Sequence, residues 1–217
     1  MKVRGLLIAT LAMVAAMVGF AFWIASGLPD GAELPTHWNA AGEIDDTRPA
    51  LQALLFPPGI MLLLGLLFAA TPSLEPLQNK LEGSAPVLRV AWIGILAMMI
   101  GTQLMIAGPV LGWDLGVSFV LLMLGFLFVA LGNVLPKSRP GFFVGIRTPW
   151  TITNTDNWIA THRLGGKLLM LAGAGVVIAA VLPLADASRM AIVVAALLSA
   201  ALVPIAYSWW LWRNKAG

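Results

Sequence analysis

The residues that could carry out chemistry lie in two polar segments, each holding one of the chain's two histidines. In the first segment, His37 is followed by the acids Glu43, Asp45 and Asp46. Imidazole and carboxylate groups are common metal donors, so this segment is a candidate metal site. One histidine and acids without a fixed spacing make a weak ligand set, however. We therefore expect no bound metal and no other cofactor.

The same segment has two further interpretations. It is either an ordered cap, in which His37 and Asn39 hydrogen-bond within the loop while Trp38 lies at the lipid interface, or a contact site for an extracellular peptide. A cationic amphipathic peptide would be attracted by the acids, and the aromatic side chain would anchor it. Residues 34–39 should be extended, because a residue before proline avoids the helical region. A turn is expected at residues 40–42, ending with Gly42.

The second polar segment, residues 132–166, is rich in bases and tryptophan. Arg147, His162 and Asp156 could serve a hydrolase that acts on lipid headgroups. Against this, the chain has no cysteine, no Gly-rich phosphate motif, no HExxH and no GxSxG. Since a membrane would separate the two histidines, they could not share one site. We therefore expect no enzymatic activity.

A short helix is predicted near Asn154, because Thr153-x-x-Asp156 has the form of a capping box. Trp158 and His162 are four residues apart and would share one face of that helix. The pair Gly165-Gly166 is expected to bend the chain toward the next membrane span.

This segment also has two interpretations. It either rests on the membrane, with Trp150 and Trp158 as anchors and the bases facing anionic headgroups, or forms a docking surface for a protein. In the docking interpretation, Arg147, Arg163 and His162 present hydrogen-bond donors. We expect Arg147, Trp150, Trp158 and His162 to form one cluster, in which Arg147 pairs with Asp156.

The rest of the chain must hold these segments in a membrane. Of its 217 residues, 59% are hydrophobic and 11% are charged, whereas soluble domains carry about 25% charged residues. The fold class is therefore all-α: one polytopic membrane domain over residues 1–217 with six transmembrane helices. The predicted spans are 6–28, 51–70, 90–111, 115–135, 168–184 (with 164 as an alternative start) and 190–212.

Few polar side chains interrupt these spans. Gln103, Thr102 and Asn133 are expected to hydrogen-bond neighbouring helices. No span centre carries an ionisable residue, which argues against a proton- or ion-coupled transporter. The first span is long enough to be retained, although the small residues 25–27 leave cleavage as an alternative.

The basic residues predict the orientation. With both termini inside, 11 of the 13 lysines and arginines face the cytoplasm, as the positive-inside rule requires. These are Lys2, Arg4, Lys80, Arg89, Lys137, Arg139, Arg147, Arg163, Lys167, Arg213 and Lys215. Residues 27–50 then form an acidic extracytoplasmic loop, and residues 136–166 form a basic, aromatic cytoplasmic loop. The basic loops also explain the pI near 9.7, so no direct nucleic-acid binding is expected.

Two motifs resemble a known family. GIRTPWT, followed by Trp158 and Thr161-His162-Arg163, resembles the signature of the SdpI family of bacterial membrane proteins, typified by an immunity protein against a secreted peptide toxin. The segment PTHWNAAGEIDD resembles a short domain of unknown function that often precedes that signature. The candidate motif residues are His37, Trp38, Asn39, Gly42 and Asp45 outside, and Asn133, Arg147, Thr148, Trp150, Thr151, Trp158, His162 and Arg163 inside.

The resemblance implies a protein of the bacterial cytoplasmic (inner) membrane. Its partners would be membrane lipids, an extracellular peptide toxin and a cytoplasmic repressor that the toxin-bound protein recruits. The alternatives are a small transport or lipid-handling protein and, third, a membrane-embedded enzyme that acts on lipid headgroups.

Overall fold

The computed structural model describes residues 3–39, 41–75 and 78–215, with the backbone alone at residues 78–82 and 215. Six of its helices are long and apolar enough to cross a membrane, so the chain is a multi-pass membrane protein. Contacts divide it into two compact units. The hairpin unit comprises Lys2–Ala69 and Gly94–Met123, and the signature unit comprises Ala70–Ile93 and Leu124–Gly217.

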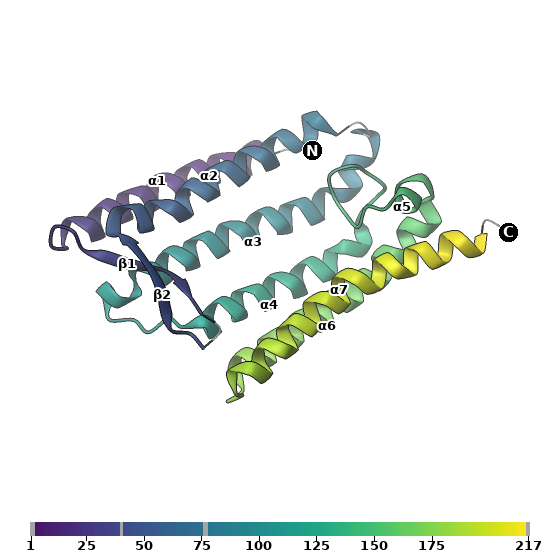
Figure 1. The fold of residues 1–217 in the computed structure, drawn as a ribbon. Coiled ribbons are helices and arrows are strands. Elements are labelled where there is room, and N and C mark those ends of the chain that lie inside the picture. Colours follow the sequence, from purple (N-terminus) through teal and green to yellow (C-terminus); the bar gives the residue numbers. More distant parts are fainter. Residues whose placement is uncertain (1–2, 40, 76–77, 216–217) are drawn as a thin grey trace. The chain divides into compact units, whose positions relative to one another are not determined.

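The hairpin unit contains α1 (Arg4–Ser26), most of α2 (Ala50–Leu74) and the second half of α3 (Gln78–Leu111), which pack along one another (Figure 1). Its core is apolar and includes Ala21, Ile24, Leu34, Ala53, Leu54 and Ile106. The buried amide of Gln103 donates to the carbonyl oxygens of Met17 (2.9 Å) and Leu54 (3.0 Å). The expected inter-helical role of Gln103 is thus confirmed, whereas Thr102 donates to Met98 of its own helix.

An antiparallel β-hairpin joins α1 to α2, formed by β1 (Glu33–Trp38) and β2 (Ile44–Pro49). Asn39 builds the turn: its Oδ1 accepts hydrogen bonds from the amides of Ala41 (2.9 Å) and Glu43 (3.0 Å). Gly42 has φ +85°, a conformation that glycine adopts without strain. The predicted extended segment is confirmed, and so is the predicted turn at residues 41 and 42, whereas residue 40 lies outside the described residues. The sequence did not predict β2, because all six of its residues are exposed and show no alternation.

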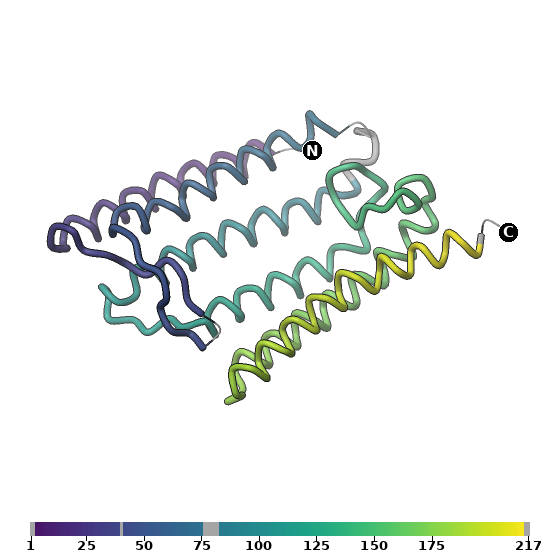
Figure 2. Tube along the Cα trace, viewed as in Figure 1, coloured from purple at the N-terminus to yellow at the C-terminus, as the bar shows by residue number. Residues whose placement is uncertain are grey.

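The signature unit contains the first part of α3, most of α4 (Val117–Val134), η1 (Leu135–Lys137), α5 (Pro149–Thr153), α6 (Thr155–Val181) and α7 (Asp186–Lys215). Helices α6 and α7 run side by side (Figure 2). Residues 182–185 join them, so the chain reverses its direction within a short turn.

Helix α6 corrects two expectations. It begins at Thr155, well before the predicted span start at 168 or 164, so much of the predicted 136–166 loop is helical. It also passes straight through Gly165 and Gly166, where a bend was expected. Both glycines are buried at helix contacts: a Cβ on Gly166 would lie 2.7 Å from the Gly132 carbonyl oxygen of α4. They therefore permit close packing in place of a bend.

Candidate functional site

Trp158 and His162 are the central pair of the candidate site in the signature unit. They lie one turn apart on α6, and their rings stack with centroids 4.0 Å apart and planes 16° from parallel. Both side chains are 0% exposed. Asn154 starts the helix that positions them, since its Oδ1 accepts a hydrogen bond from the amide of Asn157 (3.0 Å). The cap is thus Asn154, and the predicted Thr153–Asp156 capping box is wrong.

The hydrogen bonds of His162 define its tautomer. Nε2 accepts from the backbone amide of Ile146 at 2.8 Å, so this nitrogen carries no proton. Nδ1 lies 2.8 Å from the carbonyl oxygen of Trp158 and must be the donor. With both nitrogens engaged, the ring is neutral and offers no position to a substrate or metal in this conformation.

The chain crosses closely over these two rings at Gly145. Its φ is +123°, and a Cβ there would lie 2.5 Å from His162 Nε2 and 2.7 Å from Trp158 Cζ2. Only glycine fits both the backbone conformation and the space. The first residue of the GIRTPWT segment therefore has a steric reason to be glycine.

Side chains from α3, from α6 and from the residue that follows α2 hold the signature loop, residues 138–148, which leads over these rings. The Glu75 carboxylate accepts hydrogen bonds from the amides of Phe142 (3.0 Å) and Phe143 (3.1 Å) and is only 2% exposed. Ser84 of α3 accepts from the amide of Arg139 (2.9 Å). Trp158 Nε1 lies 3.2 Å from both oxygens of Ser138 and donates to them.

A second group of contacts links the end of the loop to α7. Thr148 caps α5 in a capping box with Thr151, whose hydroxyl accepts from the Thr148 amide at 2.8 Å. Trp150 Nε1 donates to Ser208 Oγ at 2.7 Å, and its ring stacks on that of Trp212. The expected single cluster is therefore two groups: Trp158 with His162, and Trp150 with α7.

The remaining predicted residues of this region lie on the surface. Arg147 is exposed and donates to the carbonyl oxygen of Phe142, in contrast to the expected pairing with Asp156. Arg163 and Asn133 are exposed as well. The buried Trp158 and His162 cannot be lipid anchors or presented donors. The exposed aromatic side chains of the signature loop are Phe142 (45%) and Phe143 (43%), which were not among the predicted site residues.

The hairpin carries the other predicted motif. His37 Nδ1 lies 2.5 Å from Asp45 Oδ1, and Asn39 Nδ2 donates to Glu43 at 2.9 Å. Trp38 is half-buried at the end of β1. Among the described residues, no three histidine or acidic side chains are placed to hold a metal ion. The polar side chains therefore order the hairpin itself, as the cap interpretation expects.

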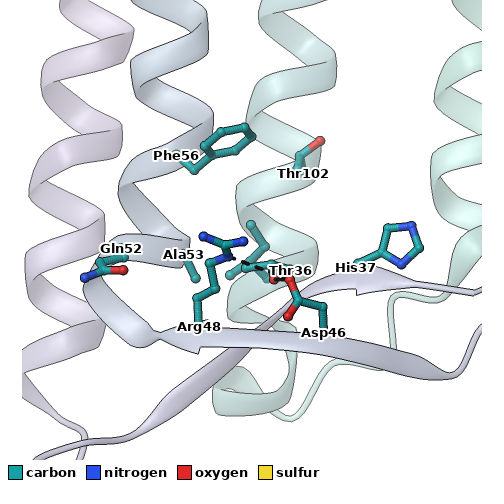
Figure 3. Close-up of a pocket in the computed structure, with 9 residues that line it drawn as sticks. Thr36, His37, Asp46, Arg48, Gln52, Ala53, Phe56 and Thr102 are labelled. Carbon is teal, nitrogen blue, oxygen red and sulfur yellow. Dashed lines mark hydrogen bonds and ion pairs between the residues drawn. The ribbon is translucent and has the colours of Figure 1, made fainter.

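A pocket of about 590 Å³ opens between the hairpin and helices α2 and α3 (Figure 3). Its lining residues are Thr36, His37, Asp46, Arg48, Gln52, Ala53, Phe56, Thr102 and Ile106. Its volume falls in the range of small-molecule sites.

Sequence reasoning missed two residues that organise the signature unit. Glu75 lay in a segment expected to be a polar loop, and its position beside prolines gave no sign of burial. Ser208 is 0% exposed, although it sits in an apolar run next to tryptophans. For Ser208 there was one weak signal in the sequence, because a lone hydroxyl in a membrane helix often marks a contact with another helix. Glu75 had no such signal, because its partners are backbone amides 67 and 68 residues away.

The chain is similar to known proteins over two separate segments. Residues 137–208 match the model of the SdpI/YfhL protein family, and residues 12–62 match a domain of unknown function, DUF1648. Over 142 residues the chain is 23% identical to "Immunity protein SdpI" of Bacillus subtilis (strain 168). The alignment covers 65% of this chain and 66% of that protein, just under two-thirds of its length. No solved structure matches.

Proposed function

We propose that this multi-pass membrane protein, which carries a DUF1648 region followed by an SdpI/YfhL family region, is an immunity and signal-transduction protein. It would protect a bacterium against a secreted peptide toxin from within the cytoplasmic membrane. Both termini would be cytoplasmic, because that orientation places most basic residues inside. The similarity to an immunity protein supports this role.

The observation that carries the proposal is the charge of the hairpin region. Residues 27–50 contain one basic residue, Arg48. Their acids are all exposed: Asp30, Glu33, Glu43, Asp45 and Asp46. Internal hydrogen bonds hold several of them on an ordered hairpin, among them the bond that the Thr47 hydroxyl donates to Glu33. Such a surface attracts a cationic peptide, and the exposed Ile44 beside it offers an apolar contact.

A binding role also fits the signature unit better than a catalytic role. Both nitrogens of His162 are engaged, so the ring cannot act as a base or ligand without rearrangement. Around it the exposed surface combines basic side chains with Phe142 and Phe143. A cytoplasmic repressor with an acidic, partly apolar face would be complementary to that surface. We infer that the protein is not an enzyme and does not bind nucleic acid directly.

A toxin-challenge experiment tests the immunity role. Cells with and without the gene are exposed to peptides secreted by the bacterium that carries it. We expect survival to depend on the gene and to fall when Glu43, Asp45 and Asp46 are replaced together by their amides. Asp114→Asn, which removes an exposed acid elsewhere, is the matched control and should protect fully. The immunity role is wrong if cells without the gene are no more sensitive to any of these peptides than cells with the gene, provided that the protein inserts normally in the cells that carry it.

The pocket favours one alternative, a small transport or lipid-handling protein. Movement of a lipid or solute by purified protein in vesicles, with no effect on toxin sensitivity, would indicate that function. Accumulation of a cleaved headgroup would instead indicate the third alternative, an enzyme.

A further inference from the structure

The pocket beneath the hairpin has two chemically distinct sides. Its rim is polar and comes from the strands, with Thr36 and His37 on β1 and Asp46 and Arg48 on β2. The other side is formed by helices and is largely apolar. Figure 3 shows Arg48 reaching from β2 toward the helical side and Phe56 above it.

The apolar side lies within two candidate membrane spans. Ala53 and Phe56 belong to the first two turns of α2, and Thr102 and Ile106 belong to α3. At 1.5 Å per residue, Phe56 is about 9 Å along the axis from the start of α2 at Ala50. Its side chain is 65% exposed, so the pocket opens to the surroundings of the helix. In a membrane those surroundings are acyl chains.

The rim carries charges of both signs. Arg48 Nε lies 3.7 Å from Asp46 Oδ2, which also accepts a hydrogen bond from Thr36 at 3.0 Å. More than half of each charged side chain, 64% for Arg48 and 51% for Asp46, is exposed, so both can bind a further group. The guanidinium is suited to a phosphate, and the carboxylate is suited to an ammonium group.

We propose that this pocket binds a zwitterionic phospholipid with a primary ammonium headgroup. The phosphate lies at Arg48, the ammonium lies at Asp46, and one acyl chain follows Phe56 and Ile106 into the bilayer. An anionic lipid fits less well, because the hairpin surface around the single guanidinium is acidic. A cationic peptide is disfavoured inside the pocket by Arg48, although the outer face of the hairpin attracts it.

Native mass spectrometry of the full chain in detergent tests the proposal. Phosphatidylethanolamine, phosphatidylcholine and phosphatidylglycerol are added separately, and retained lipid is counted per chain. We expect one phosphatidylethanolamine to be retained in preference to the other two. Arg48→Gln should weaken its retention about tenfold, as loss of one charge-assisted contact predicts. Arg213→Gln, which removes an exposed arginine from α7, is the matched control and should retain the lipid normally.

A second variant separates binding from folding. Thr102→Phe fills the pocket from the α3 side while leaving the hairpin charges in place, and it should also weaken retention by about tenfold or more. Helix content by circular dichroism must stay at the wild-type value in both variants for the comparison to count. Equal retention of all three lipids, or retention that survives both substitutions, would overturn the proposal. Displacement of the bound lipid by a cationic amphipathic peptide, with no preference among lipids, would assign the pocket to a peptide and also overturn it.

Discussion

The backbone amide of Ile146 donates a 2.8 Å hydrogen bond to Nε2 of His162, across the point where the signature loop passes over a buried ring. The His162 side chain, 16 residues away along the chain, thus serves as the acceptor for this amide in place of a backbone carbonyl oxygen. The opposite ring nitrogen, Nδ1, faces the Trp158 carbonyl. The contact between the loop and the ring therefore requires the tautomer that carries its proton on Nδ1. This hydrogen bond thus holds the GIRTPWT segment against α6, and we call it the Ile146–His162 lock.

His162→Phe should weaken this lock while keeping an aromatic ring beside Trp158. The variant leaves the Ile146 amide without its acceptor, which costs about 1–3 kcal/mol. We expect a lower thermal unfolding midpoint in detergent and faster tryptic cleavage after Arg147. His37→Phe makes the same change at an exposed histidine and should have little effect on either measurement. Identical unfolding and cleavage of His162→Phe and the wild type would contradict the lock.

Glu75→Gln should loosen the same loop from its other side. The amide keeps one acceptor oxygen but removes the charge and the second oxygen, so the hydrogen bonds from Phe142 and Phe143 weaken. Hydrogen bonds to charged groups contribute about 1.5–3 kcal/mol each, and we expect a loss of that order in stability. Asp30→Asn is the control, since Asp30 is exposed. The free energy of unfolding in detergent is the measurement, and equal losses in both variants would refute a specific role for Glu75.

The sequence predicted the membrane spans well because apolar runs of this length have few alternatives to a helix in lipid. It also predicted the extended segment before Trp38 and the placement of Trp158 and His162 on one helix face. It did not predict where the fifth span begins, because residues 155–166 are polar enough to suggest a separate short helix that ends in a bend at Gly165 and Gly166, whereas the structure has one continuous helix. In the structure, burial against neighbouring helices offsets that polarity, as at Thr161 and Asn157, which hydrogen-bond each other at 3.0 Å.

The division of the signature residues into two groups also lay beyond the sequence. Trp150 and Trp158 have the same residue type and similar surroundings along the chain. Their partners, Ser208 and Ser138, lie 58 and 20 residues away, so only the fold decides which tryptophan meets which serine. Long-range pairs of this kind leave no periodic signal in a single sequence.

Ser208→Ala tests the second group. The substitution removes the acceptor of Trp150 Nε1 and should cost about 1 kcal/mol. Ser199→Ala is a close control on the same helix, because Ser199 is exposed and donates only to the Ala196 carbonyl of its own turn. Thermal unfolding of both variants in detergent is compared with the wild type. A stability for Ser208→Ala equal to that of the control would show that Trp150 does not depend on this contact.

Gly166→Ala should separate α4 from α6. A Cβ there would meet the Gly132 carbonyl oxygen at 2.7 Å and the Pro136 ring at 2.8 Å, and neither group can rotate away. We expect a loss of about 1–3 kcal/mol from overpacking, larger than the gain in helix propensity. Gly175→Ala has no atom within 4 Å of the new Cβ and should be neutral or stabilising. A stabilised Gly166→Ala would mean that the two helices do not pack this closely.

The orientation in the membrane gives the last prediction. Lys and Arg in short loops determine which side a loop occupies, and the chain places one basic residue in residues 27–50 but several between 136 and 166. A reporter inserted after Arg48 should therefore score extracytoplasmic, and one inserted after Thr153 should score cytoplasmic. Alkaline phosphatase and green fluorescent protein report the two sides with opposite signals, so each insertion controls the other. Insertions that score on the same side would break the six-span arrangement, and an exchanged pair would place the acidic hairpin inside, where a secreted toxin could not reach it.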